Sequence, residues 1–182
     1  RMMVNLLEGF VSAGVRVDLL RIKKMGPFAE LVPPGANIVD LPSDHAAGNI
    51  CAISRYINRV CPDAILAAKD RANQSVLTAR MLSRRSPRVV VRLGTHLSAA
   101  MEKKPLLSRW LRRAPSRLLY PKADAIIAVS EGVAADTSRI TGLPASRIRV
   151  VKNPVITERT LLLADEQAAH HWFDDPTIPV IL

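Results

Sequence analysis

Residues 123–151 read ADAIIAVSEGVAADTSRITGLPASRIRVV, and three patterns in this stretch decide the fold. The apolar run at 125–129 lacks polar alternation, which is typical of a strand covered on both faces. Residues 132–141 then predict a helix that ends at Gly142, because glycine readily adopts the left-handed conformation that closes a helix. A second strand follows at 148–151. This order of strand, helix and strand predicts a right-handed βαβ unit with parallel strands.

The alternation of helices and strands continues toward the beginning of the chain. The apolar spacing predicts helices over 2–14, around 49–60 and over 72–85, with Gly14 ending the first of them. Strands are predicted at 15–19, 37–41, 64–68 and 89–91. Short strands separated by segments of helix length favour an α/β domain with a doubly wound parallel sheet.

Both ends of the sequence are atypical of such a domain. The chain opens in a helix with no strand before it, and it closes on the strand-like run 179–182 with no partner after it. We therefore expect a piece truncated at both ends, which lacks a strand in front and a whole domain behind. Residues 1–156 form the expected main domain, and 157–182 form the connection and the first strand of the next domain.

Composition limits the class of protein. Hydrophobic residues make up 48% of the 182 residues and charged residues 23%, which is ordinary for a globular chain and excludes disorder as the main state. Only 4% are aromatic, so the core is expected to be aliphatic. No apolar run approaches the roughly 20 residues of a membrane-spanning helix. Glu8 comes too early for a secretory signal, so we expect a cytoplasmic chain in which Cys51 and Cys61 are free thiols.

The net charge is unusual. The chain has 26 Lys and Arg against 16 Asp and Glu, which gives +10. A surface this basic attracts polyanions such as nucleic acid, anionic lipid or phosphorylated substrates. Charge alone does not choose among these partners.

A candidate site follows from the expected topology, because ligands of open parallel sheets bind beyond the carboxyl ends of the strands. Polar residues follow four of the predicted strands at that end. They are Lys69, Asp70, Arg71 and Asn73 after the first, Arg92, Gly94, Thr95 and His96 after the second, Ser130 and Glu131 after the third, and Lys152 and Asn153 after the fourth. We expect these residues to meet at one rim.

Several of these residues also have a purely structural interpretation. His96 could satisfy backbone groups in its loop, and Ser130 is well placed to cap the helix that follows it. The same helix N-terminus can hold a phosphate, and Glu131 can offset its dipole. Asn153 precedes Pro154 and could only shape the turn. The sequence leaves these alternatives open.

Other well-known catalytic motifs are absent. The chain has no Walker-type glycine loop, no G-x-G-x-x-G and no nucleophile elbow. His170 and His171 lie beside Asp174 and Asp175, but adjacent histidines in a polar connection are interpreted here as surface residues. We therefore predict no metal site.

A basic segment over 103–122 contains no acidic residue. Its arginines Arg109, Arg112, Arg113 and Arg117 alternate with apolar residues, so that a helix here would be amphipathic. Such a helix suits an anionic membrane surface, and the alternative is a helix that packs on the core with a solvated basic back. Pro105 and Pro115 interrupt the segment and argue against a single long helix.

The sequence resembles the N-terminal domain of family 4 glycosyltransferases, which have the two-domain GT-B fold. The resemblance is strongest over 123–134 and then over Gly142-Leu143-Pro144 and 148–155, which reads IRVVKNPV. Further support comes from RVCPD at 59–63, from Ala72-Asn73, and from HWF at 171–173 ahead of the final apolar run. The match extends over nearly the whole chain.

The resemblance implies the Rossmann-like N-terminal half of a GT-B enzyme. It also implies retaining transfer of a sugar from a nucleotide-sugar donor to a lipid-linked or cell-envelope glycan, without a metal. The donor would be held by the missing C-terminal domain, so this chain alone would bind no cofactor and be inactive. His96 would be the catalytic residue that faces the transferred sugar. The implied substrate-binding residues are Asn73, Gly94, Ser130, Glu131 and Asn153.

The members of this family often act on lipid-linked acceptors at the cytoplasmic face of a membrane, and the basic segment fits a peripheral position there. The alternative is a non-catalytic Rossmann-like module whose charge binds a polyanion such as nucleic acid. No nucleic-acid motif or aromatic stacking platform supports that alternative, since the aromatic residues are few and scattered.

Overall fold

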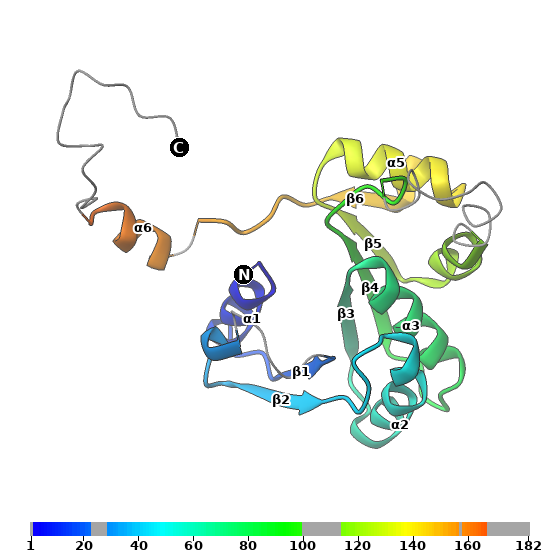
Figure 1. Cartoon of the computed structure of the whole chain (residues 1–182), viewed down its shortest axis with the longest axis horizontal. Helices are drawn as coiled ribbons and strands as arrows, with labels where there is room; N and C mark the ends of the chain where they lie inside the picture. Colours follow the sequence, from blue (N-terminus) through cyan, green and yellow to red (C-terminus); the bar gives the residue numbers. More distant parts are fainter. Residues whose placement is uncertain (1, 23–28, 100–113, 157, 167–182) are drawn as a thin grey trace.

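The computed structural model describes residues 2–22, 29–99, 114–156 and 158–166, and it shows the expected alternation of helices and strands (Figure 1). The elements are α1 (Met2–Ser12), β1 (Val17–Arg21), β2 (Ala36–Asp40), α2 (Ile50–Val60), β3 (Ala64–Ala68), α3 (Asp70–Met81), β4 (Arg88–Leu93), β5 (Ala125–Ala128), α5 (Glu131–Thr141), β6 (Ile148–Val150) and α6 (Glu158–Ala164). Residues 114–119 are also helical and lead into a 3-10 turn at Tyr120–Lys122.

The strands form two parallel sheets rather than one. Strands β3, β4, β5 and β6 are hydrogen-bonded in that order, and β1 pairs with β2 in a separate two-stranded sheet. Among the described residues, β1 and β3 each pair with a single strand. The parallel, Rossmann-like architecture is confirmed, while the expectation of one continuous sheet is not met, because the apolar pattern identifies strands but not their partners.

The hydrophobic core belongs to the four-stranded sheet. Helices α2 and α3 pack against each other, α3 also contacts β3 and β4, and α5 contacts β5 and β6 (Figure 1). The largest fully buried apolar side chains are Tyr120, Ile57, Leu77, Leu93, Ile126, Ile140, Val89 and Val91. The core is therefore mostly aliphatic, as predicted, with Tyr120 as its largest member.

Helix ends follow the local sequence signals. Gly14 and Gly142 have φ of 73° and 78°, which is the left-handed conformation expected of residues that close a helix. Ser130 caps α5, because its Oγ accepts a hydrogen bond from the Val133 N–H at 3.3 Å. Strand β4 is longer than the predicted 89–91, so that Arg92 lies inside the strand instead of in the loop after it.

The two-stranded sheet is joined to the rest of the chain by polar contacts. The Tyr56 hydroxyl of α2 donates to the Asp18 carboxylate of β1. Asn5 of α1 donates from Nδ2 to the Pro154 carbonyl oxygen at 2.8 Å, beyond β6. In Figure 1 the chain after β6 accordingly runs back toward α1, and α6 lies apart from both sheets. No helix in the described ranges is long and apolar enough to span a membrane.

Candidate functional site

The carboxyl ends of β4, β5 and β6 lie at one edge of the sheet. Leu93 pairs with Ala128, and Ala128 pairs with Val150. The pairing continues one residue further, since the Val129 N–H donates to the Leu93 carbonyl at 3.2 Å and the Val151 N–H to the Ala128 carbonyl at 2.9 Å. The loops that follow these strands therefore leave from the same edge, as the topology predicts.

The His96 side chain lies against the N-terminus of α5. Its Nε2 is 3.5 Å from the point where a Cβ atom on Gly132 would lie, and the Ser130 Oγ is 4.0 Å from the same point. His96, Ser130 and Glu131 are all exposed to solvent. The structure therefore brings together an imidazole, a hydroxyl and the positive end of a helix dipole on an open surface.

The loop that carries His96 is held in place by Asp136 of α5. The Ser98 N–H donates to Asp136 Oδ2 at 3.0 Å, and Arg139 Nη2 lies 2.6 Å from Oδ1. Burial works to raise the pKa of the Asp136 carboxyl, but hydrogen bonds from Ser98 and Arg139 outweigh it and the pKa is lowered. Asp136 thus fixes the backbone two residues beyond His96. The sequence analysis does not identify Asp136 as a site residue. The one signal in the sequence is that an acidic residue falls on the face of α5 that is otherwise buried.

A second group of site residues surrounds Arg92. This residue of β4 is only 8% exposed, and its Nη2 donates to Oδ1 of Asn153 beyond β6. Gly94 lies next to the guanidinium, since a Cβ atom there would be 3.3 Å from Nη1. Gly94 and Asn153 are exposed. The structure therefore joins both residues through an arginine that the sequence analysis places only among the polar residues of the rim.

Asn73 does not lie at the rim. It is completely buried, and its Nδ2 donates to the Arg92 carbonyl at 3.2 Å and to the Tyr120 hydroxyl oxygen at 3.4 Å. The Tyr120 hydroxyl in turn donates to Asp70 Oδ1 at 2.6 Å, and burial raises the pKa of Tyr120. Asn73 therefore lies in the interior and not at the rim where the sequence analysis expects it. The first turn of α3 points its amide inward, where it ties α3 to β4.

The turn between β3 and α3 is strained. Lys69 has φ 78° and ψ 137°, a conformation that side-chain-bearing residues rarely adopt. Its side chain is exposed at the carboxyl end of β3. Backbone strain of this kind concentrates at functional sites, and no pattern in the sequence indicates it.

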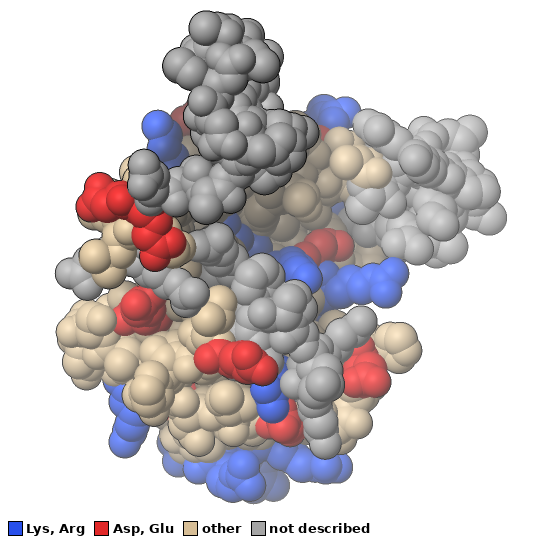
Figure 2. Space-filling view, turned by 60° about the vertical axis from the view of Figure 1, so that its left-hand side comes forward, with Lys and Arg blue, Asp and Glu red and all other residues tan. Residues whose placement is uncertain are grey.

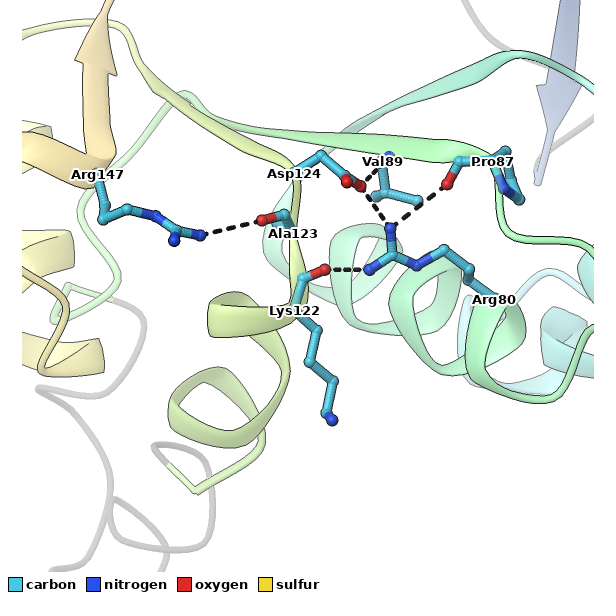
Figure 3. Close-up of polar contacts among 7 residues, drawn as sticks. All are labelled: Arg80, Pro87, Val89, Lys122, Ala123, Asp124 and Arg147. Carbon is cyan, nitrogen blue, oxygen red and sulfur yellow. Dashed lines mark hydrogen bonds and ion pairs between the residues drawn. The ribbon is translucent and has the colours of Figure 1, made fainter.

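The opposite edge of the sheet is closed by an ion pair (Figure 3). Arg80 of α3 pairs with Asp124 and also donates to the carbonyl oxygens of Pro87 and Lys122. The Val89 N–H donates to Asp124 Oδ2 at 2.7 Å, and this bond, followed by those from Arg80, lowers the pKa of Asp124. The Asp124 carboxylate at the start of β5 therefore joins α3 and β4 at the amino end of the sheet.

The remaining predicted residues fall mostly outside the described part of the chain. Arg109, Arg112 and Arg113 of the basic segment, and the pair His170 and His171, all do so. Arg117 is described, and its Nε donates to the Ile140 carbonyl at 3.0 Å, near the C-terminus of α5. Within the described ranges, no group of His, Cys, Asp or Glu is arranged to hold a metal ion, and both cysteines are free.

The face drawn in Figure 2 has described side chains of both charges. The face in Figure 2 has basic side chains along its lower edge and near its middle, with acidic side chains among them. A continuous basic face of the kind that tracks a nucleic-acid backbone is not seen among the described residues of this view.

Comparisons with known proteins agree with this architecture. The family model described as "Glycosyl transferase 4-like domain" matches residues 1–154. A search of curated protein sequences finds no significant match.

Two solved structures are similar to the chain. The apo form of the lipopolysaccharide outer core galactosyltransferase WaaB has a TM-score of 0.63 at 17% identity, covering 85% of this chain and 41% of that one. A proposed UDP-N-acetylglucosamine 2-epimerase from Listeria monocytogenes has a TM-score of 0.56 at 14% identity, covering 93% of this chain and 45% of that one. The chain therefore spans less than half the length of either protein.

Proposed function

Because the chain belongs to the glycosyl transferase 4-like domain family, we propose that it is the acceptor-side half of a glycosyltransferase. The observation that carries the proposal is the meeting of His96, Ser130 and the α5 N-terminus at the carboxyl edge of the sheet. This is the edge at which open parallel sheets bind their ligands.

The proposed reaction transfers a sugar from a nucleotide-sugar donor with retention. The bond between the anomeric carbon and the diphosphate oxygen breaks, a bond from the acceptor hydroxyl oxygen to that carbon forms, and the acceptor proton passes to the departing diphosphate oxygen. The nucleoside diphosphate leaves with the electron pair. His96 is proposed to hydrogen-bond the transferred sugar in the transition state, because its exposed ring lies beside the N-terminus of α5 while Asp136 fixes its loop.

A second domain is proposed to complete the enzyme and to hold most of the donor nucleotide. The two similar structures are more than twice as long as the part that the chain matches, which supports this proposal. A lipid-linked or cell-envelope glycan is proposed as the acceptor. The similar structure WaaB is described as a lipopolysaccharide outer core galactosyltransferase, and lipopolysaccharide is a cell-envelope glycan, which supports this choice of acceptor.

The test compares two exposed histidines in the full-length protein. His96→Ala is expected to lower sugar transfer about 100-fold or more, because it removes a positioned polar group from the transition state. His45→Ala is the matched control, since His45 is also exposed but lies in the loop before α2. Both variants are expected to unfold in urea within about 0.5 kcal/mol of wild type. Equal loss of transfer in both variants, or unfolding of His96→Ala alone, would contradict the catalytic role.

The measurement uses a panel of nucleotide sugars with a lipid extract as acceptor, and product is detected by mass spectrometry. Absence of transfer with every donor, together with tight binding to duplex DNA but not to anionic vesicles, would favour the polyanion-binding alternative. The family match argues against that outcome.

A further inference from the structure

We propose that Arg92, Asn153 and the open backbone at Gly94 form a phosphate-binding site at the carboxyl edge of the four-stranded sheet. The assignment rests on the proposed function for the identity of the phosphate, which would belong to the donor diphosphate or to a lipid-linked acceptor. The geometry that carries it is independent of that function.

The first observation is a buried charge without an acid. Arg92 is 8% exposed, and among the described residues no carboxylate pairs with it. Burial accordingly lowers the pKa of its guanidinium, with no opposing charge to raise it. A guanidinium removed from water is costly unless it is paired, and the neutral Asn153 amide compensates only in part. The buried guanidinium of Arg92 would therefore be stabilised by a bound anion.

The second observation is that the guanidinium remains accessible. Only Nη2 has a hydrogen-bond partner in the described chain, the Oδ1 atom of Asn153. The other guanidinium nitrogens have no partner among the described residues, and none of them is among the buried polar atoms that lack both a partner and contact with solvent. Gly94 explains the access, because a Cβ at that position would lie 3.3 Å from Nη1 and crowd it. Donors that are unused and reachable are what a ligand requires.

The third observation is the chemistry around the opening. A guanidinium presents paired N–H donors in one plane, which match two oxygens of a phosphate. The N-terminus of α5 emerges at the same edge and adds a positive dipole end. Lys152, exposed beside Asn153, adds a further positive charge. Phosphate is therefore the ligand class that these groups favour.

The test measures binding of inorganic phosphate to the full-length protein by isothermal titration calorimetry at constant ionic strength. Arg92→Gln is expected to weaken binding at least tenfold. Arg88→Gln is the matched control, because Arg88 is exposed at the other end of the same strand and its loss changes the net charge equally. Binding by Arg88→Gln is expected to stay within twofold of wild type. Equal affinity in the two variants would overturn the proposal.

Asn153→Asp separates binding from folding. The new carboxylate would pair with Arg92 and compete with phosphate, so binding is expected to weaken at least tenfold while the unfolding temperature stays equal or rises. Unchanged phosphate binding in Asn153→Asp would show that Arg92 does not hold the anion and would overturn the proposal.

Two further probes identify the source of the phosphate. If Arg92→Gln weakens binding of a nucleoside diphosphate, the site serves the donor. If it weakens binding to vesicles containing phosphatidic acid, the site serves a lipid-linked acceptor. These readouts need no sugar transfer. If the protein binds phosphate through Arg92 but transfers no sugar, the phosphate site stands and the proposed function is contradicted. If the protein transfers sugar but Arg92→Gln binds phosphate as wild type does, the proposed function stands and the phosphate site is contradicted.

Discussion

Two arginines at opposite edges of the same sheet have different surroundings. Arg80, at the amino edge, has a side chain that is 13% exposed and is surrounded by the Asp124 carboxylate and two backbone carbonyls (Figure 3). Arg92, at the carboxyl edge, is also buried but has one neutral amide as its partner in the described chain. Within the described chain Arg80 has a carboxylate as its partner, and Arg92 does not.

This difference assigns different tasks to the two edges. A cation that is paired with a carboxylate and with backbone carbonyls contributes to stability and has few donors left for a ligand. A cation left without an acid reduces stability and retains its donors. The strain at Lys69 lies at the same carboxyl edge, so the costly features of the fold concentrate where the ligand is proposed to bind.

Replacing each arginine by methionine tests the comparison most strongly. Arg80→Met is expected to lower the free energy of unfolding by about 1–2 kcal/mol, because Asp124 and two carbonyl oxygens lose their donor while the carboxylate stays partly solvated. Arg92→Met is expected to leave it unchanged or to raise it by about 1 kcal/mol, because an unpaired charge is removed. Urea denaturation at neutral pH measures both. If Arg92→Met were as destabilising as Arg80→Met, the two edges would not differ in the way described.

Acid titration of stability sharpens the comparison. The pKa of Asp124 is lowered by the Val89 N–H and by Arg80, so its charged form stabilises the fold above its unfolded pKa. That contribution is lost as pH falls through the lower, folded pKa. Asp124→Asn should therefore differ from wild type by about 1 kcal/mol at neutral pH, a value discounted because the carboxylate is partly exposed, and the difference should shrink on acidification.

The same titration has an internal control at the other edge. Arg92→Met changes no carboxylate, so its stability curve should run parallel to that of wild type through the acid range. The lowered pKa of Asp136 is common to all these proteins and cancels in the differences. A wild-type advantage over Asp124→Asn that persisted at low pH would show that Asp124 acts through its shape rather than its charge.

The smallest expected effect concerns backbone strain at the carboxyl edge. Lys69→Gly is expected to raise the free energy of unfolding by about 0.5–1 kcal/mol, because glycine adopts a positive φ without strain. Lys152→Gly is the matched control at the same edge. Lys152 is not among the positive-φ residues, so its replacement should be neutral or slightly destabilising. Thermal unfolding distinguishes the two, and a loss of stability in Lys69→Gly would contradict the strain.

Much of the fold was predictable because its signals are local. The apolar run at 125–129 indicated a buried strand, Ser130 indicated a helix start, and Gly142 indicated a helix end, and each of these is confirmed. The convergence of His96 and Ser130 followed from the rule that parallel strands share one carboxyl edge. Asn73 was misplaced because the orientation of a side chain in the first turn of a helix depends on what packs against it.

The sequence by itself determined the alternation of strands and helices, their caps and the family to which the chain belongs, because these depend on residues that are neighbours along the chain. Only the tertiary structure decided that Arg92 meets Asn153, 61 residues away, and that Arg80 meets Asp124, 44 residues away. It also decided that the strands divide into two sheets. The periodicity of apolar residues indicates which face of a helix or strand is buried. Which charged side chains form pairs depends on how elements that are distant in the sequence pack together.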